Sequence, residues 1–559
     1  MKEREKISLG REGLEKISTG VPNLDRILNG GIPKYSVNII AGPPGTGKTI
    51  LAQQIVFANT DENSSAPYLV TVSEPTVKLI RYQQQFSYFD KGKLTQNVHY
   101  LDIGTSLLRG GIDEVDKQIE EYINEYNPTI LVIDSFKAIH EAADTPSNLR
   151  EFSYKLAVRL ATWECTSFLV GEYGKEDINT APVFAIADGI IFMDREERGM
   201  QTLRQLEVIK MRGDGYDSGR HPFKITKDGI QVFPRIKTPA EIPNYEVAST
   251  RVSSGIEGLD DMMESGILQG TVTLVAGSAG TGKTLLGLHF LLEGIKHGEP
   301  GVLVTFQEVP SLIKTFASGF GWDLEQMERE GLLKILYTSP VEMGVDEHAA
   351  TIKETINQMK AKRIVIDSLK DIEIATPDKV RYKDYIYSLV NFFRAEGVTS
   401  LVTNEISELF GAFVMSEYGI SFISDNVILL RYVEIESRIS RAISVLKMRG
   451  SNHAKDVREF RISAEGMEIL EPFREYGSIL SGAPKLSTIP GADNLPPKSR
   501  QVLNMFRGMD KVTAEMIAQK MGMDETQVMG ILTMLTNLGF VTKSREGNKD
   551  YYKTSVLWT

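Results

Sequence analysis

A long internal repeat is the feature that most restricts the fold of this chain. The stretch STGVPNLDRILNGGIPKYSVNIIAGPPGTGKT, which begins at Ser18, aligns without a gap on SSGIEGLDDMMESGILQGTVTLVAGSAGTGKT, which begins at Ser253. Later landmarks keep nearly the same spacing, because ILVID ends at Asp134 and RIVID ends at Asp367. The tetrapeptide KMRG also occurs once in each copy. A duplication at such constant spacing indicates that one whole folding unit is encoded twice.

The repeat divides the 559 residues into domains, since a chain of this length is too long for one compact core. We expect one copy of the unit at residues 1–247 and a second copy at 248–484. A segment rich in Gly, Pro and Ser at 485–497 reads as a linker, and a small domain of different character follows at 498–559.

Each copy alternates between two kinds of segment. Short β-branched runs such as SVNIIAG and TILVIDS alternate with helical stretches such as VDKQIEEYINEY. This alternation predicts an α/β fold of βαβ units around a mainly parallel central sheet. In the last domain, three stretches of helical periodicity precede a hairpin around EGN, which is a winged-helix arrangement.

The composition excludes several classes of protein. Hydrophobic residues at 42% and charged residues at 25% are typical of a soluble globular protein. The chain has no apolar run of the roughly 18 residues that a membrane span needs, and its N-terminus has no apolar signal-peptide core. We therefore expect a cytoplasmic protein without membrane contact. The formal charge of −11 argues against a surface that coats nucleic acid along its whole length.

Two phosphate-binding loops are predicted, one in each copy. GPPGTGKT and GSAGTGKT both match the P-loop pattern G-x-x-x-x-G-K-[ST], and each lies between an apolar strand and a helical stretch. The glycines let backbone N–H groups turn toward phosphate oxygens, the lysine neutralises phosphate charge and the threonine offers a hydroxyl to Mg²⁺. The predicted nucleotide-binding residues are Gly45, Thr46, Gly47, Lys48 and Thr49, and Gly280, Thr281, Gly282, Lys283 and Thr284.

An aspartate ends a buried apolar strand in each copy, at Asp134 and Asp367. A carboxylate at the carboxyl end of a central strand can hold the water shell of Mg²⁺, and the distance from the P-loop matches in both copies. We therefore predict that both aspartates, together with Thr49 and Thr284, form the metal sites. The alternative is that each aspartate only caps the helix that follows.

A nucleoside triphosphatase also needs a group that orients or deprotonates the attacking water. The segments TVSEP and TFQEVP follow the next strand after each P-loop helix and contain Glu74 and Glu308. We predict a catalytic role for these two glutamates. The alternative is a solvated glutamate in a turn before proline.

The KMRG tetrapeptides place two cations one residue apart, late in each copy. On a strand, alternate residues share one face. The predicted faces are Leu206, Val208, Lys210 and Arg212 in the first copy, and Ile443, Val445, Lys447 and Arg449 in the second. Because these strands lie far along the chain from their own P-loops, we expect the cations to reach the γ-phosphate bound by a neighbouring subunit, as an arginine finger does. The alternative is a pair of solvated charges on an edge strand.

Taken together, these motifs resemble the KaiC family of tandem RecA-like ATPases over about residues 10–485. The resemblance rests on the paired P-loops, VIDS twice, TRVSSGIEGLD, SDNVILLRYVEIESRISRAISVLKMRGS and REYGSILSGAP. It implies a two-tiered hexameric ring that binds ATP with Mg²⁺ between protomers, with the KMRG cations acting across the interface.

The chain departs from the family pattern at three places. Ser73 and Gln307 replace the first of two adjacent glutamates, which affects the expected rate of hydrolysis in both copies. Clock members of the family autophosphorylate an adjacent Ser-Thr pair, and here the matching positions are Ser421 and Phe422. Ser421 is therefore the single candidate for autokinase activity at that pair, and an interface serine is the alternative. The winged-helix domain is the third departure.

We therefore expect a ring-forming regulatory ATPase. The alternatives are a RecA-like DNA-dependent ATPase of recombinase or helicase type and a nearly inactive nucleotide-dependent scaffold. The predicted helix DETQVMGILTMLTNLG contains no Lys or Arg, on which DNA contacts depend. We accordingly expect the C-terminal region to bind a regulatory protein partner rather than DNA.

Overall fold

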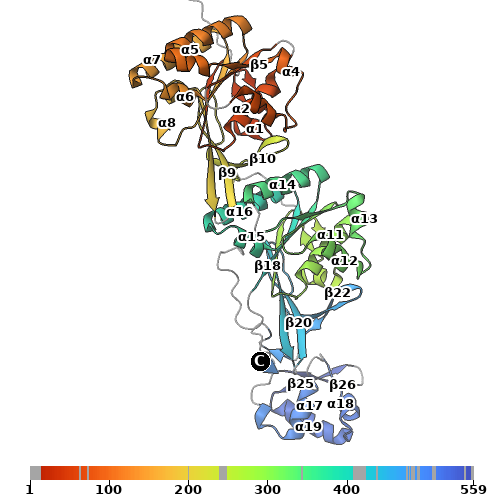
Figure 1. The fold of residues 1–559 in the computed structure, drawn as a ribbon. Coiled ribbons are helices and arrows are strands. Elements are labelled where there is room, and N and C mark those ends of the chain that lie inside the picture. The colour runs from red at the N-terminus through yellow and green to blue at the C-terminus, as the bar shows by residue number, and fades with distance from the viewer. Residues whose placement is uncertain are drawn as a thin grey trace, which may run out of the picture. The chain divides into compact units, whose positions relative to one another are not determined.

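The computed structural model describes residues 14–61, 64–71, 75–198, 201–237, 249–340, 344–406, 423–435, 438–473, 476–477, 479, 485–486, 492–506, 511–546 and 549–555. The chain divides into two compact units. The first comprises Met1–Ile236 with Asp346–Ala350, and the second comprises Lys237–Val345 with Thr351–Thr559. Each unit contains a nine-stranded sheet with helices on both faces (Figure 1).

The sheet of the first unit has the strand order β11-β10-β9-β8-β3-β7-β6-β4-β5. From β5 to β8 all neighbouring strands are parallel, and from β8 to β11 they are antiparallel. The strands are β3 (Val37–Ala41), β4 (Ala66–Val70), β5 (Val98–Asp102), β6 (Ile130–Asp134), β7 (Thr166–Gly171), β8 (Gly189–Arg198), β9 (Gln201–Met211), β10 (Arg220–Thr226) and β11 (Gly229–Val232), and a separate pair is β1 (Lys16–Ile17) with β2 (Ile32–Pro33).

Helices connect the parallel strands of the first unit, as βαβ units require. They are α2 (Lys48–Asn59), α3 (Thr76–Gln83), α4 (Lys93–Gln96), α5 (Gly104–Tyr126), α6 (Phe136–Glu141), α7 (Pro146–Thr162), α8 (Asp177–Thr180) and α9 (Val183–Ile186). The short helix α1 (Leu24–Ile27) instead lies between β1 and β2.

The second unit repeats this sheet, with the order β16-β15-β17-β18-β14-β19-β20-β21-β22. Its strands are β14 (Val272–Gly277), β15 (Gly301–Thr305), β16 (Leu333–Tyr337), β17 (Arg363–Asp367), β18 (Thr399–Glu405), β19 (Asn426–Ile435), β20 (Arg438–Met448), β21 (Arg458–Ser463) and β22 (Gly466–Pro472), with the pair β12 (Arg251–Val252) and β13 (Ile267–Leu268). The helices are α10 (Glu257–Met262), α11 (Lys283–Lys296), α12 (Pro310–Ser318), α13 (Leu324–Arg329), α14 (Val345–Met359), α15 (Leu369–Ala375) and α16 (Lys379–Ala395).

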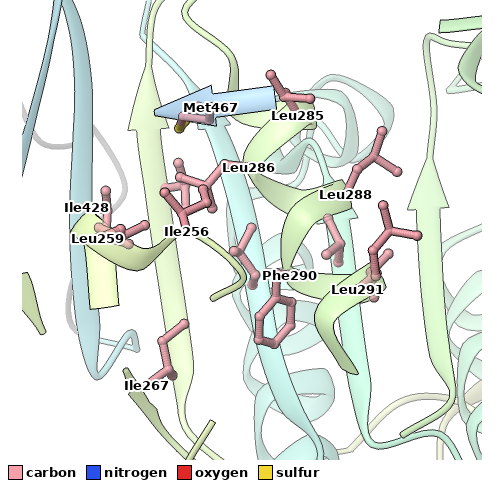
Figure 2. Close-up of a cluster of buried hydrophobic side chains, with 14 of the residues drawn as sticks. Ile256, Leu259, Ile267, Leu285, Leu286, Leu288, Phe290, Leu291, Ile428 and Met467 are labelled. Carbon is pink, nitrogen blue, oxygen red and sulfur yellow. The ribbon is translucent and has the colours of Figure 1, made fainter. Parts of the chain in front are cut away.

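Each sheet buries apolar side chains on both faces, which is why its parallel strands are apolar throughout. In β6, Val132 belongs to the cluster under α2, whereas Leu131 and Ile133 belong to the cluster under α5 and α7. In the second unit, α11 packs on the corresponding face through residues such as Leu286 and Phe290 (Figure 2). Burial of each such side chain contributes about 1.5–3 kcal/mol.

A smaller module follows the second sheet. Its elements are the short pair β23 (Tyr476–Gly477) and β24 (Lys485–Leu486), the 3₁₀ turn Ala492–Asn494, the helices α17 (Pro497–Asn504), α18 (Ala514–Met521) and α19 (Glu525–Asn537), and the hairpin β25 (Val541–Glu546) and β26 (Lys549–Thr554). The three helices and the hairpin share one apolar cluster, which includes Val502, Ile517, Leu532 and Tyr552.

The prediction that the KMRG cations share one strand face with the apolar residues two and four positions before the lysine is wrong, because each strand contains a β-bulge. In β9, Lys210 pairs with Ile190 while Val208 pairs with the next residue, Ile191, so Ile209 is an extra residue. The same irregularity separates Lys447 from Val445 in β20. One extra residue inverts the alternation of side chains between the two faces of the sheet. Lys210 therefore lies on the face opposite Val208, and Lys447 on the face opposite Val445.

The two sheets confirm the predicted α/β class, with tandem RecA-like domains and mostly parallel strands. Within the described ranges, the structure contains no helix with the length and apolar character needed to cross a membrane.

Candidate functional site

The P-loop of the first unit connects the end of β3 at Ala41 to the start of α2 at Lys48. Gly47 has φ 102°, and a Cβ atom there would lie 2.9 Å from Cδ1 of Ile225. Gly282 has φ 105° at the same place in the second unit. Only glycine adopts this backbone without strain, so these residues turn the loop and aim the first N–H groups of each helix at one point.

The P-loop lysines lie folded over their own loops. Nζ of Lys48 donates to the carbonyl oxygen of Pro43 at 2.8 Å. Nζ of Lys283 donates to the carbonyl oxygens of Gly277 and Ser278, both at 2.9 Å. Burial lowers the pKa of both lysines, although a nearby glutamate and the strand-end aspartate of each unit oppose that shift. A buried ammonium group that donates to carbonyl oxygens of its own loop is suited to bind a phosphate anion.

The threonine after each lysine contacts the predicted metal-binding aspartate. Oγ1 of Thr49 donates to Oδ2 of Asp134 at 2.8 Å, and Oγ1 of Thr284 donates to Oδ2 of Asp367 at 2.6 Å. Mg²⁺ prefers such oxygen ligands and keeps several waters and phosphate oxygens in its shell. Among the described residues no group of three or more His, Cys, Asp and Glu side chains could hold a metal by itself. The residues present therefore suit a Mg²⁺ ion that the nucleotide helps to hold.

A cavity of about 830 Å³ lies over this edge of the first sheet. Its walls include the P-loop, Asp134, Lys137 and Glu141 of the segment after β6, and Glu172 after β7. The volume is in the range of cavities that bind a small-molecule cofactor.

A second hydroxyl group donates to each strand-end aspartate, and the two units use different residues for it. In the first unit the phenol of Tyr68, on β4, donates to Oδ2 of Asp134 at 2.7 Å. Burial raises the pKa of Tyr68 well above its usual value, and the charge of Asp134 adds to the shift. In the second unit the hydroxyl of Thr403, on β18, donates to Oδ1 of Asp367. Sequence reasoning missed both residues; the one signal was a tyrosine within the otherwise apolar run APYLV.

The structure describes one of the two predicted catalytic glutamates, Glu308, but not the other. Glu74 lies outside the described residues. Glu308 follows β15, and the hydroxyl of Thr305 donates to its backbone carbonyl at 3.0 Å. The residue as a whole is exposed, yet partial burial raises the pKa of its carboxyl group and the charge of Asp367 raises it further. Glu308 comes three residues after Thr305, which pairs with Asp367 on the neighbouring strand, so it follows β15 at the sheet edge that carries the Thr284–Asp367 pair.

The structure does not bring the KMRG cations to the P-loop of their own unit. The backbone N–H of Arg212 donates to the carbonyl of Asp188 at 2.9 Å, and the Asp188 carboxylate accepts from the backbone N–H of Val37 at 3.0 Å. Val37 begins β3, whereas the P-loop follows Ala41 at the other end of that strand. Five residues of strand separate the two edges of the sheet by roughly 15 Å.

The side chains of the cations have local partners at this far edge. Arg212 and Arg449 are 58% exposed and form ion pairs with Asp188 at 3.2 Å and with Asp425 at 3.4 Å. Nζ of Lys447 donates to the carbonyl of Ser424 at 2.6 Å. Burial, followed by the charge of the neighbouring arginine, lowers the pKa of both Lys210 and Lys447. The guanidinium groups therefore project from the surface at the edge opposite the P-loop. Ser421 and Phe422 lie outside the described residues.

Two mixed sheets, each with a P-loop and a Thr–Asp pair at the carboxyl ends of its parallel strands, define a tandem P-loop nucleoside triphosphatase of RecA-like fold. The family model for the KaiC ATPase matches residues 17–237 and, again, residues 252–474. The chain therefore belongs to the KaiC family and is a KaiC-type ATPase with two tandem domains.

Curated relatives cover most of the chain. The circadian clock oscillator protein KaiC of Picosynechococcus sp. strain PCC 7002 is 34% identical over 484 residues, which are 85% of this chain and 93% of the relative. KaiC 1 of Synechocystis sp. strain PCC 6803 is 31% identical over 524 residues, or 92% and 99% of the two chains. KaiC of Synechococcus elongatus is 32% identical over 489 residues, or 86% and 93%. The similarity thus includes both units.

Proposed function

We propose that this protein is a ring-forming regulatory ATPase whose nucleotides bind between adjacent copies of the chain. One copy supplies the P-loop, the threonine–aspartate pair and the glutamate after the second strand. The next copy supplies the KMRG cations, Lys210 with Arg212 or Lys447 with Arg449. Since the family is the KaiC ATPase family, ATP with Mg²⁺ is the nucleotide we assign to both sites.

The position of the cations is the observation that carries this proposal. Arg212 and Arg449 project from the sheet edge opposite their own P-loops, so neither can reach a phosphate bound in its own unit. A head-to-tail arrangement of copies brings one edge of a sheet against the other edge of its neighbour, and closes into a ring when the rotation allows. The family resemblance makes a hexamer the expected closed form.

Within each site the residues have separate roles. The loop N–H groups and Lys48 or Lys283 bind the β- and γ-phosphates, and Thr49 with Asp134, or Thr284 with Asp367, holds the hydrated Mg²⁺. When bound, Mg²⁺ neutralises charge on the phosphates. Glu74 and Glu308 orient or deprotonate water, and the cations of the neighbouring copy stabilise the charge that develops on the transferred phosphoryl group.

A mixing experiment tests whether each site is shared between copies. One variant lacks both P-loop lysines (Lys48→Ala with Lys283→Ala), and the other lacks both KMRG arginines (Arg212→Ala with Arg449→Ala). Each variant alone should lose turnover. Re-assembled equal mixtures should regain up to about a quarter of wild-type turnover. At random, about one interface in four combines an intact P-loop lysine from one copy with an intact arginine from the next.

If the cations acted within their own unit, mixing would restore nothing. Arg220→Ala is the matched control for loss of an arginine, because Arg220 is also about half exposed and pairs loosely with Glu207 at 3.9 Å. Its turnover should stay within about twofold of the wild type.

The C-terminal module is the surface that we assign to a regulatory protein partner. Helix α19 contains no Lys or Arg, so a nucleic-acid contact would lack phosphate-binding groups on that helix. Addition of single- or double-stranded DNA should leave ATP hydrolysis unchanged, and stimulation would favour the motor alternative. Ser421 is the proposed phosphoacceptor, which phosphopeptide mapping with Ser421→Ala as the control tests.

A further inference from the structure

The hydrogen-bond partners of the strand-end aspartates differ systematically between the two units. Strand registers establish which positions correspond. In the first unit Val70 pairs with Asp134 and Tyr68 pairs with Val132. In the second unit Thr305 pairs with Asp367 and Leu303 pairs with Val365. Tyr68 and Leu303 therefore occupy the same position, beneath the aspartate and facing the P-loop helix.

The P-loop helix also has a polar residue in the first unit where the second unit has an apolar one. Gln53 on α2 is the fifth residue after Lys48, and Leu288 on α11 is the fifth after Lys283. Both are fully buried, and Gln53 accepts a hydrogen bond of 3.2 Å from Tyr100. The second unit thus has two leucines, Leu288 and Leu303, in a space where the first unit has polar side chains.

The opposite exchange occurs on the strand at the other side of the aspartate. In the first unit Val170 pairs directly with Asp134. In the second unit Ile366 pairs with Val402, so the residue beside Asp367 is Thr403, which donates to Oδ1. In each unit a further hydroxyl group therefore donates to the aspartate, but it comes from a different strand and reaches a different carboxylate oxygen.

We propose that Tyr68 in the first unit and Thr403 in the second are positioning residues that orient the metal-binding aspartates, so that the two tiers bind Mg²⁺ through differently held carboxylates. Tyr68 and Thr49 both donate to Oδ2 of Asp134, whereas Thr403 and Thr284 each donate to a separate oxygen of Asp367. Hydrogen-bond donors orient a metal-binding carboxylate, and outer partners of this kind strongly affect metal affinity. The inference rests on the proposed metal role of the aspartates.

The test measures the Mg²⁺ concentration that half-saturates binding of a fluorescent, non-hydrolysable ATP analogue to the full-length chain. The Lys283→Ala background reports on the first unit, and the Lys48→Ala background reports on the second. Tyr68→Phe should raise the half-saturating concentration of the first unit by about tenfold or more. It should leave the half-saturating concentration of the second unit unchanged. Thr403→Val should raise that of the second unit and leave that of the first unchanged.

Tyr100→Phe is the matched control in the first unit. Its ring lies 5.2 Å from that of Tyr68, and its hydroxyl contacts Gln53 rather than Asp134. Nucleotide binding without Mg²⁺ should be equal in all these variants. The double variant Tyr68→Phe with Val170→Thr moves the arrangement of the second unit into the first, and it should recover most of the lost Mg²⁺ affinity.

The outcomes separate this inference from the proposed function. If the parent backgrounds bound the analogue without any Mg²⁺ dependence, the metal role itself would be wrong. If the parents depended on Mg²⁺ but Tyr68→Phe matched Tyr100→Phe, only the positioning role would be overturned. Should Tyr68→Phe fail to fold, Thr403→Val in the second unit decides by the same criterion.

Discussion

Nε2 of Gln307 donates a hydrogen bond of 2.7 Å to Oδ1 of Asp371, and this contact connects the end of β15 to the start of α15. Asp371 is buried, and its other oxygen accepts from the hydroxyl of Ser368 at 2.7 Å and from the backbone N–H of Ser368 at 3.3 Å. Ser368 directly follows Asp367. Gln307 stands where the family pattern has a glutamate. Its amide therefore connects this position, through Asp371, to the segment that contains Asp367.

The amide of Gln307 supplies a donor to a buried carboxylate, which an ionised glutamate at this position could not do. We expect Gln307→Glu to destabilise the second unit by about 1–3 kcal/mol, since two carboxylates would face each other and Asp371 would lose a donor. ATP hydrolysis by the second unit should fall with it. Chemical denaturation of the Lys48→Ala background measures the first effect and steady-state hydrolysis the second.

Asp371→Asn is the companion change, and the double variant restores an acceptor–donor pair. Gln307→Glu with Asp371→Asn should therefore be more stable than the sum of the two single changes predicts. Strict additivity would mean that the contact contributes nothing to stability.

Assembly should depend on the nucleotide, because the proposed sites are completed by a second copy. Light scattering should give a mass near six chains with ATP and Mg²⁺, and a smaller mass after both are removed. Turnover at the wild-type rate by a dilute single chain would contradict the shared site.

The P-loop backbone of the first unit should not tolerate a side chain at Gly47. Gly47→Ala would place a methyl group 2.9 Å from Ile225 at φ 102°, so we expect nucleotide affinity in the Lys283→Ala background to fall by at least about tenfold. Gly215→Ala is the control, because an added Cβ atom meets nothing within 4 Å there and φ is not positive. Binding of a fluorescent ATP analogue measures both.

A partly buried histidine should make the second unit less stable in acid. Nε2 of His289 accepts from the backbone N–H of Met467 at 3.0 Å, and burial lowers the pKa of His289 to about 4. The unfolded chain binds a proton near the ordinary pKa of 6.5, whereas the folded chain does not until about pH 4, so stability is lost as the pH falls through this window. The loss by pH 4.5 should be up to about 2 kcal/mol.

His289→Gln isolates this contribution from the other acidic and histidine groups, because glutamine keeps an acceptor but does not titrate. The variant should lose less stability than the wild type between pH 7 and pH 4.5. Parallel pH profiles for the two proteins would show that the histidine is not responsible.

Local sequence patterns were sufficient for the fold class and for the residues of the P-loops. A glycine with positive φ, a lysine and a threonine at fixed spacing produce the same loop wherever a strand precedes and a helix follows, because the geometry depends on the backbone of a few consecutive residues. The aspartates at the ends of β6 and β17 could be predicted for the same reason, since apolar runs that end in a carboxylate identify a strand end.

Tertiary structure alone determined what these residues contact. The bulges that turn Lys210 and Lys447 to the opposite face depend on how β9 and β20 pair with their neighbours, which alternation within one strand does not encode. The contacts of Tyr68 with Asp134 and of Gln307 with Asp371 join residues 66 and 64 positions apart, and they form only because folding brings different strands and helices to one sheet edge. The backbone of a P-loop is set by a few consecutive residues, whereas strand bulges and side-chain contacts follow from how distant segments pack.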